Sequence, residues 1–217
     1  MPFALDLFME RIREAYATWE APAITLIAQG GATPFEVLVS TVLSLRTRDR
    51  VTYEASRRLF ARARTPEAIL ALTADAIEAL IRPVSFSPTK ARRLREISER
   101  ILTVFRGEVP GEMDALLSLP GVGRKTANLV LVEGLGKPGI CVDTHVHRIS
   151  NRLGYVKTKN ADKTELALRE KLPREYWVEY PEILVTFGQL LCRPVSPLCS
   201  RCPVSDLCPK IGVEKHR

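Results

Sequence analysis

Two adjacent cations stand at the start of an expected helix in the segment LPGVGRKTANLVL, residues 119–131. Gly121 and Gly123 belong to a tight turn, and Arg124 and Lys125 follow as the first helical residues. A helix N-terminus carries about half a positive charge and ordinarily attracts carboxylates or phosphates. An anionic ligand at the turn would explain cations at this end of a helix.

The turn is suited to a phosphate, because glycines admit close approach of the backbone and the first helical amides have no partner within the helix. Arg124 would pair with that phosphate. Lys125 shares its helix face with Leu129 and Val132 and lies beside Arg124. Apolar neighbours, a second cation and the positive helix end all lower the pKa of an amine. The pattern predicts a neutral, nucleophilic Lys125, although most helical lysines are surface residues.

A carboxylate follows in CVDTHVHRISNRLG, residues 141–154. Asp143 stands where an N-cap belongs, and Asp is among the best capping residues. The same carboxylate near a lysine amine can accept its proton and stabilise positive charge at a sugar C1′. His145 and His147 lie on the helix that Asp143 begins, and packing or phosphate contact is the ordinary role of such residues. Cys141 is expected to be a small buried apolar residue.

The other four cysteines form a C-x6-C-x2-C-x5-C pattern within 17 residues: Cys192, Cys199, Cys202 and Cys208. Four thiolates this close can bind zinc or a [4Fe-4S] cluster. Zinc sites more often have two C-x2-C pairs, and this pattern has one. The spacing therefore favours iron–sulfur and leaves zinc open. Such crowding also argues against a disulfide framework and for a reducing compartment.

The charge balance indicates a polyanionic partner. The 217 residues include 32 Lys and Arg against 25 Asp and Glu, a net charge of +7, and 46% are hydrophobic, enough for a real core. Two basic runs, residues 46–64 and 88–106, favour nucleic acid, although each alone is explained by a solvated helix face. The first residues do not have the pattern of a signal peptide, and no apolar run is long enough to span a membrane. We expect a soluble cytoplasmic protein, associated with the nucleoid if the source is prokaryotic.

Helix start signals recur along the chain. Thr33, Pro34 and Glu36 form a capping box with proline at the first helical position, and the Thr65 and Ser87 segments repeat the Thr/Ser-Pro start. Further helical periods cover residues 49–63, 74–82, 113–119, 124–135, 144–153, 162–171 and 181–191. The strand-like piece GICV is too short to build a sheet. The patterns predict an all-α protein of about ten helices.

Three features occur here in one order: LPGVGRKTA, then VDTHVHRISNR, then the four cysteines. Together they resemble the endonuclease III family of helix-hairpin-helix DNA glycosylases and AP lyases. The resemblance implies a two-lobed all-α fold with a DNA cleft between the lobes. Residues 27–137 would form a six-helix domain with the hairpin at about 113–135, and residues 1–26 with 138–217 a domain that holds an iron–sulfur cluster.

The resemblance also implies roles for individual residues. Lys125 would be the Schiff-base nucleophile and Asp143 the catalytic carboxylate. The four cysteines would bind a structural [4Fe-4S] cluster. The Gly121–Gly123 turn, Arg124 and His145 would contact DNA. The implied substrate is double-stranded DNA with an oxidised pyrimidine or an abasic site, cut by β-elimination after base removal by a monomer.

Two positions depart from the family pattern. Arg46 stands where the family usually has a glutamine that fills the gap left by the flipped nucleotide, and its fork can bond a guanine edge. Phe86, preceded by Ser85 and followed by Ser87, replaces the usual wedge pattern, and its ring can intercalate. A phosphate-binding arginine and a buried aromatic are the plainer interpretations. These departures affect the expected lesion range and leave the chemistry unchanged.

Two other functions remain as alternatives. One is a mismatch-specific glycosylase of the same superfamily, although adenine-specific members lack a lysine at position 125 and thymine-specific members have tyrosine there. The other is a non-enzymatic DNA-binding module with zinc at the cysteines.

Overall fold

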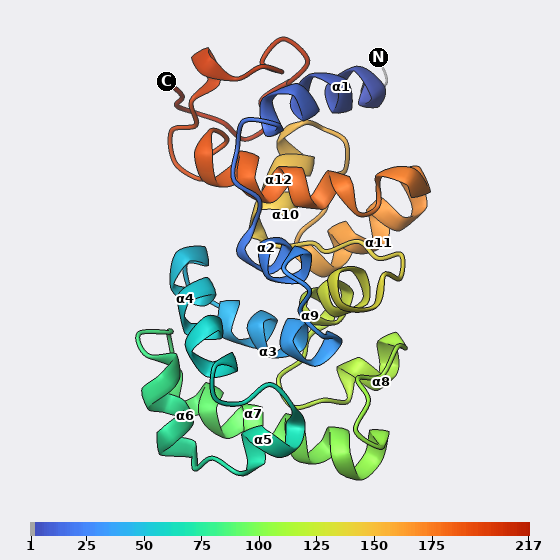
Figure 1. Ribbon diagram of the computed structural model, residues 1–217. Coiled ribbons are helices and arrows are strands. Elements are labelled where there is room, and N and C mark those ends of the chain that lie inside the picture. The colour runs from blue at the N-terminus through green and yellow to red at the C-terminus, as the bar shows by residue number, and fades with distance from the viewer. Residues whose placement is uncertain (1–2) are drawn as a thin grey trace. The chain divides into compact units, whose positions relative to one another are not determined.

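The computed structural model describes residues 3–217, and this part of the chain consists of helices and loops without a β-strand (Figure 1). It divides into two compact units. The hairpin unit is continuous, Ala23–Gly139, and the cysteine unit combines the residues up to Pro22 with Ile140–Arg217. The boundaries expected from the resemblance lie within a few residues of this division. The predicted all-α class is confirmed.

The hairpin unit surrounds one large apolar core. Its helices are α2 Ala23–Gln29, α3 Pro34–Ser44, α4 Asp49–Phe60, α5 Pro66–Leu70, α6 Ala74–Ile81, α7 Ser87–Phe105, α8 Met113–Leu117 and α9 Arg124–Leu129. The long helix α7 packs against α5, α6 and α3. Its inward residues Leu94, Ile97 and Ile101 are fully buried, and this burial fixes the helix that precedes the hairpin.

All three Thr/Ser-Pro segments begin helices, and in two of them the hydroxyl residue is the N-cap. Thr33 and Glu36 form the reciprocal capping box, with the Glu36 amide donating to Thr33 Oγ1 at 3.3 Å. The Thr65 hydroxyl likewise accepts from the Ala68 amide. The third segment forms α7 over the predicted residues 87–105, but Ser87 is its first residue and the N-cap is Phe86, in the left-handed conformation with φ 59°. Ser87 is buried instead, and its hydroxyl donates to Glu78 at 3.4 Å.

The helix expected over residues 124–135 changes its winding part of the way along. The α-helical part ends at Leu129, and a π-helix, η1, continues over Val130–Gly134. At Gly134 a Cβ would lie 3.3 Å from the Pro34 Cα, so the glycine lets η1 approach α3 closely. Such π segments occur often at functional sites.

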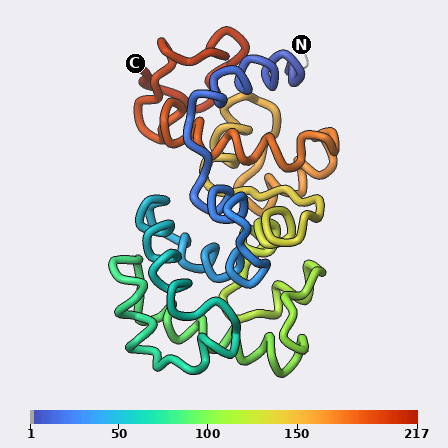
Figure 2. The backbone as a smooth tube through the Cα atoms, in the orientation of Figure 1, coloured from blue at the N-terminus to red at the C-terminus, as the bar shows by residue number. Residues whose placement is uncertain are grey.

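The cysteine unit joins the two ends of the chain (Figure 2). Its helices are α1 Leu5–Tyr16, α10 Thr144–Arg152, α11 Ala161–Lys171 and α12 Glu179–Leu190, with short 3-10 turns η2 Arg174–Tyr176 and η3 Cys199–Arg201. Helix α1 packs against α12 and is fastened by ion pairs, including Arg13 to Glu179 at 2.7 Å. Trp19 stacks parallel to Phe187.

Local sequence patterns did not mark α1 or α2, although the resemblance implied an N-terminal helix. Helix α1 has no side-chain cap. In α2, the first amide, that of Ala23, donates to Asp49 of α4 at 3.3 Å, a partner 26 residues away. A cap supplied from such a distance leaves no signal in the local sequence. None of the helices in residues 3–217 has the length and apolar character needed to cross a membrane.

Candidate functional site

In the hairpin, a glycine turn joins α8 to α9. The side chain of Val122, within this turn, is buried. Gly121 has φ +70°, a conformation that other residues rarely adopt, and a Cβ there would overlap the Arg93 side chain. Gly123 is the N-cap of α9 with extended backbone, φ −100°, and a Cβ there would meet nothing within 4 Å. The fold itself therefore requires glycine at 121, whereas it does not at 123.

Arg124 and Lys125 occupy the first turn of α9, and both side chains are half-buried. The next residues, Thr126 and Ala127, are buried against the core, so the position of the lysine is set by a well-packed helix face. One turn on, Leu129 packs on a small apolar cluster built around α2. The structure thus presents Lys125 on the second helix of the hairpin, directly after the glycine turn.

Asp143 begins α10 in the cysteine unit and is its N-cap, as expected. Its Oδ1 accepts from the amide of His145 at 2.7 Å and from that of Val146 at 3.0 Å. These two hydrogen bonds fix the orientation of the carboxylate. The capping and chemical roles are compatible, because a carboxylate that accepts two amide hydrogen bonds at Oδ1 keeps further acceptor capacity.

The two histidines of α10 have different surroundings. His145 Nδ1 lies 3.0 Å from Nη2 of Arg148. Because a guanidinium only donates, Nδ1 is the acceptor and the ring proton of neutral His145 is on Nε2. His147 Nδ1 lies 2.7 Å from the Thr164 hydroxyl and belongs to a polar contact between α10 and α11, the packing role expected as the ordinary one.

Two arginines of α10 fasten the helix to the first cysteine of the cluster. Arg148 donates to the carbonyl oxygen of Cys192 at 2.8 Å, and burial lowers its pKa. Arg152, which is 9% exposed, donates to Cys192 Sγ at 3.4 Å and to the carbonyls of Arg193 and Pro194 at 2.7 Å each. The helix that begins at Asp143 therefore ends on the cysteine segment.

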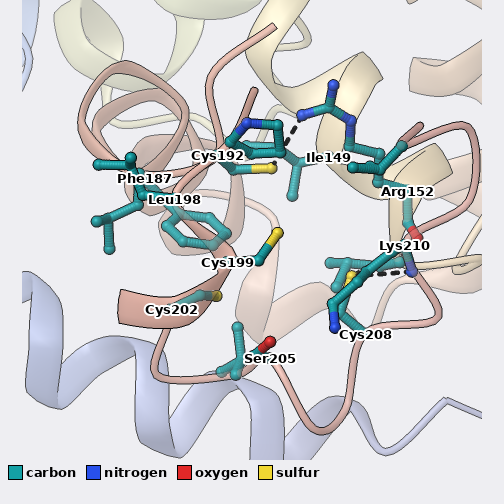
Figure 3. Close-up of a pocket in the computed structure, with 15 residues that line it drawn as sticks. Ile149, Arg152, Phe187, Cys192, Leu198, Cys199, Cys202, Ser205, Cys208 and Lys210 are labelled. Carbon is teal, nitrogen blue, oxygen red and sulfur yellow. Dashed lines mark hydrogen bonds between the residues drawn. The ribbon is translucent and has the colours of Figure 1, made fainter. Parts of the chain in front are cut away.

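The four cysteines of the C-x6-C-x2-C-x5-C pattern line one pocket, with apolar walls from Ile149 and Phe187 among others (Figure 3). Burial, followed by the neighbouring cysteines, raises the pKa of Cys202 to about 11 and also raises that of Cys208. Bound iron would reverse this effect, because metal coordination deprotonates a thiol.

The donor set fits an iron–sulfur cluster. All four thiols of the pattern line one pocket, and four cysteine thiolates are the usual ligand set of a [4Fe-4S] cluster. The amide of Lys210 donates to Cys208 Sγ at 3.3 Å, the kind of N–H···S contact that stabilises cluster thiolates.

Arg46 and Phe86 come together in the hairpin unit. The guanidinium carbon of Arg46 lies 5.8 Å from the centre of the Phe86 ring, and this ring is 59% exposed. The alternative interpretation of Phe86 as a buried aromatic was wrong. Both residues have positive φ, 56° and 59°, which is unusual for side chains of this size.

The basic runs are only partly available to a ligand. Arg58 and Arg95 donate to main-chain carbonyls at Leu80 and Leu70, respectively, and Arg64 pairs with the buried Glu36. Lys90 is 5% exposed and bonds only inward, to Leu43, Leu45 and Thr47. Nothing in the sequence separates these structural cations from the others.

Comparison with known proteins decides the family. Residues 39–174 match the model of the HhH-GPD superfamily of base excision DNA repair proteins, and residues 192–208 match the iron–sulfur binding domain of endonuclease III. Endonuclease III of Thermotoga maritima is 47% identical over 175 residues, which cover 81% of this chain and 82% of that protein. The chain belongs to the endonuclease III family.

Solved structures agree with this assignment. A non-covalent endonuclease III–DNA complex superposes with a TM-score of 0.85 at 32% identity, covering 95% of this chain and 94% of that one. A trapped endonuclease III–DNA covalent intermediate has a TM-score of 0.78 at 37% identity, covering 82% and 84%. The protein is a DNA glycosylase and AP lyase of base excision repair, binds DNA and carries a [4Fe-4S] cluster. The alternative of a non-enzymatic zinc module is therefore excluded.

Proposed function

We propose that this endonuclease III family member excises oxidised pyrimidines from double-stranded DNA as a monomer, with Lys125 as the nucleophile and Asp143 as the carboxylate. One observation carries the assignment of the lysine. Lys125 stands half-buried in the first turn of α9, directly after the glycine turn, in a chain similar to a protein trapped covalently on DNA.

The chemistry removes the base first and cuts the strand second. After the damaged nucleotide leaves the stack, at a cost of a few kcal/mol, the Lys125 amine forms a bond to C1′. The glycosidic bond breaks, its electron pair leaves with the base, and the base takes up a proton. Opening of the sugar ring gives a protonated Schiff base. Loss of a proton from C2′ then expels the 3′ phosphate oxygen, and the strand is cut 3′ to the lesion.

Asp143 supports the first step. We assign it to accept the amine proton of Lys125 and to stabilise the positive charge that develops at C1′. Its Oδ1 is held by the amides of His145 and Val146. A carboxylate fixed in this way needs no reorganisation when charge appears, which is the condition for effective electrostatic stabilisation.

Contacts to DNA come from several elements in this proposal. The amides after Gly121 and Gly123, together with Arg124, hold a phosphate without reading the sequence. His145 adds a phosphate contact through Nε2–H. Arg46 fills the gap left by the extruded nucleotide, and Phe86 wedges between base steps.

The four cysteines hold the cluster in this proposal: Cys192, Cys199, Cys202 and Cys208. When bound, the cluster supplies structural cross-links across the loop-rich segment 192–208. Arg152 and the amide of Lys210 donate to the sulfurs of Cys192 and Cys208 and stabilise them as thiolates.

Borohydride trapping tests the assignment of Lys125. With a duplex that contains an abasic site, the wild-type protein should form a covalent adduct that survives denaturation. Lys125→Gln should form none and still bind the duplex. A persistent adduct in Lys125→Gln would show that another amine is the nucleophile.

Asp143→Asn tests the carboxylate separately from the cap. Asparagine caps helices as well as aspartate does, so the fold should be unchanged. Single-turnover base removal should slow by about 10²–10⁴-fold, the usual size of a lost acid–base group. Unchanged base removal in a folded Asp143→Asn would reject the role of the carboxylate.

A further inference from the structure

A buried lysine connects the two loops that carry Arg46 and Phe86. Lys90 lies in the first turn of α7 and is 5% exposed. Its Nζ donates to the carbonyl of Leu43 at 2.7 Å, to that of Leu45 at 2.6 Å and to the Thr47 hydroxyl at 3.2 Å. These acceptors end α3 and form the loop that contains Arg46, so a residue of α7 caps α3.

The Lys90 ammonium group has one acceptor oxygen for each of its N–H bonds. It has three N–H bonds, and three oxygens of the protein accept them. The oxygens belong to two carbonyls and a hydroxyl rather than to a carboxylate. Burial, followed by the charge of Arg93, lowers the pKa of Lys90 to about 8, so the group is still mainly protonated at neutral pH. Burial of a cation without an ion pair costs folding free energy. Retention of Lys90 at this site therefore points to a role beyond stability.

Thr47 extends the connection to the second loop. Its hydroxyl oxygen accepts from Lys90 and also from the amide of Ser85, at 3.2 Å. The same hydroxyl lies 3.4 Å from the Leu45 carbonyl, to which it donates. Its hydrogen-bonding capacity is therefore fully used. The residue before Phe86 is thus tied to the residue after Arg46.

The connected loops present two strained, exposed side chains as a stacked pair. Arg46 and Phe86 both have left-handed backbone, which costs free energy in residues of this size. The Phe86 ring is 59% exposed and the Arg46 guanidinium stacks at 5.8 Å from its centre. Strain of this kind persists only where the surrounding contacts enforce it, and Lys90 and Thr47 make those contacts.

We propose that Lys90 is a positioning residue that holds Arg46 and Phe86 as one preorganised unit for insertion into damaged duplex DNA. The proposal rests on the insertion roles given above to Arg46 and Phe86. Lys90 itself touches no DNA. It sets the conformation from which the pair enters the helix, so selectivity for damaged DNA is a joint property of the two loops.

The test measures a selectivity ratio. This ratio is the dissociation constant for an intact duplex divided by that for the same duplex with a stable abasic-site analogue. Lys90→Met should lower this ratio by about tenfold, within the range for loss of one base–aromatic stacking contact. In the Arg46→Ala background, which lacks the side chain that fills the gap, Lys90→Met should lower the ratio much less, because the two substitutions affect the same unit. A wild-type ratio near one, or full additivity of the two substitutions, would overturn the proposal.

Arg95→Met is the matched control. Arg95 also lies on α7 and also donates to main-chain carbonyls, those of Leu70 and Leu72, away from the Arg46 loop. It should reduce thermal stability and leave the selectivity ratio unchanged. An equal fall of the ratio in Arg95→Met would assign Lys90 a merely structural role.

A milder variant covers the case in which Lys90→Met does not fold. Thr47→Val removes only the hydroxyl that joins Lys90 to Ser85 and should lower the selectivity ratio in the same direction. A folded Thr47→Val with the wild-type ratio counts against the proposal. Borohydride trapping of each variant on an abasic duplex distinguishes failure of the Lys90 proposal from failure of the proposed function. Trapping depends on Lys125 and should persist in every variant that retains this lysine.

Discussion

Each of the two units uses buried or half-buried cations to hold the main chain beside a functional segment, but the cations differ. In the hairpin unit, Lys90 donates to the carbonyls of Leu43 and Leu45. In the cysteine unit, Arg148 and Arg152 donate to carbonyls between Gly188 and Pro194. Lys90 ends α3 in place of a local cap, whereas α12 also has a backbone cap, in which the Leu191 amide donates to the Phe187 carbonyl.

The choice of cation follows the local charge. Beside the cysteines, the thiolates of a bound cluster need permanent positive charge, and arginine keeps its proton even when burial lowers its pKa, as at Arg148. Around Lys90 the acceptors are neutral oxygens, so an amine is sufficient. Lysine can lose its charge on burial and arginine cannot, and the two units therefore respond differently to pH.

The largest effect is expected from Arg152→Met. The substitution leaves the carbonyls of Arg193 and Pro194 without their donor and removes the contact to Cys192 Sγ. Unfolding free energy of the cysteine unit should fall by about 3–5 kcal/mol, as when one partner of a buried charged contact is removed. Purified protein should contain much less iron and show weaker visible absorbance.

Arg201→Met provides the control for that experiment. Arg201 lies in η3 of the same cysteine segment and is exposed, so its loss removes an equal charge without removing a buried contact. Iron content should equal that of the wild type. Full iron content in Arg152→Met would contradict the role given to Arg152.

The second prediction concerns the pH dependence of stability. The pKa of Lys90 falls from 10.5 to about 8 on folding, so the unfolded state binds this proton more tightly. Stability contributed by Lys90 should be constant below pH 8, rise as the pH passes from 8 to 10.5, and level off above. The rise should be about 3–4 kcal/mol, at about 1.4 kcal/mol for each pKa unit between 8 and 10.5.

The measurement compares denaturant unfolding of the wild type and Lys90→Met across this range, because groups common to both cancel in the difference. The wild type should gain stability relative to Lys90→Met as the pH rises. Arg148→Met should show no such difference, since the guanidinium stays protonated in both states. A flat difference for Lys90→Met would show that the amine keeps its proton on folding.

The sequence predicted most of the elements but few of the contacts that position the site. Thr33 and Glu36 specify the start of α3 locally, and the structure has this capping box. The C-terminal end of α3 depends on Lys90, 45 residues beyond Leu45, and no local pattern shows that contact. Likewise α2 begins on a cap from Asp49. Signals within one turn of a helix were readable, whereas long-range caps were not.

Long-range contacts also explain why the basic runs could not be interpreted from the sequence alone. Four cations of the two basic runs make hydrogen bonds or ion pairs within the hairpin unit: Arg58, Arg64, Lys90 and Arg95. The exposed Phe86 was weighed as a buried aromatic for the same reason, since exposure depends on the left-handed backbone that Lys90 and Thr47 enforce. The cysteine pattern was easier to interpret because its four members lie within one short segment.

Glycines give a third, smaller contrast between the units. Gly188 lies where α12 meets α10, and a Cβ there would approach the His145 Cβ to 2.8 Å. Gly188→Ala should therefore destabilise the cysteine unit by about 1–3 kcal/mol through overpacking. In the hairpin, Gly123→Ala should leave thermal stability within about 0.5 kcal/mol, because nothing lies within 4 Å and the backbone is extended.

DNA affinity then separates the two glycines. Gly123→Ala should weaken duplex binding several-fold, since the added methyl group would occupy the place of the phosphate. Gly121→Ala serves as the comparison, because φ +70° and the overlap with Arg93 should lower stability as well as affinity. Wild-type affinity in Gly123→Ala would indicate that no phosphate docks at this turn.

The smallest effect distinguishes the two kinds of arginine within the hairpin unit. Arg48 is exposed at the N-cap of α4, whereas Arg95 donates to the Leu70 carbonyl. If Arg48 pairs with a phosphate, Arg48→Ala should reduce the slope of log affinity against log salt by about 0.9 and leave stability unchanged. Arg95→Ala should do the reverse, lowering stability by about 1–3 kcal/mol with an unchanged slope. Equal salt slopes for Arg48→Ala and the wild type would show that Arg48 does not contact DNA. A reduced salt slope for Arg95→Ala would show that Arg95 leaves its carbonyl acceptors and contacts DNA.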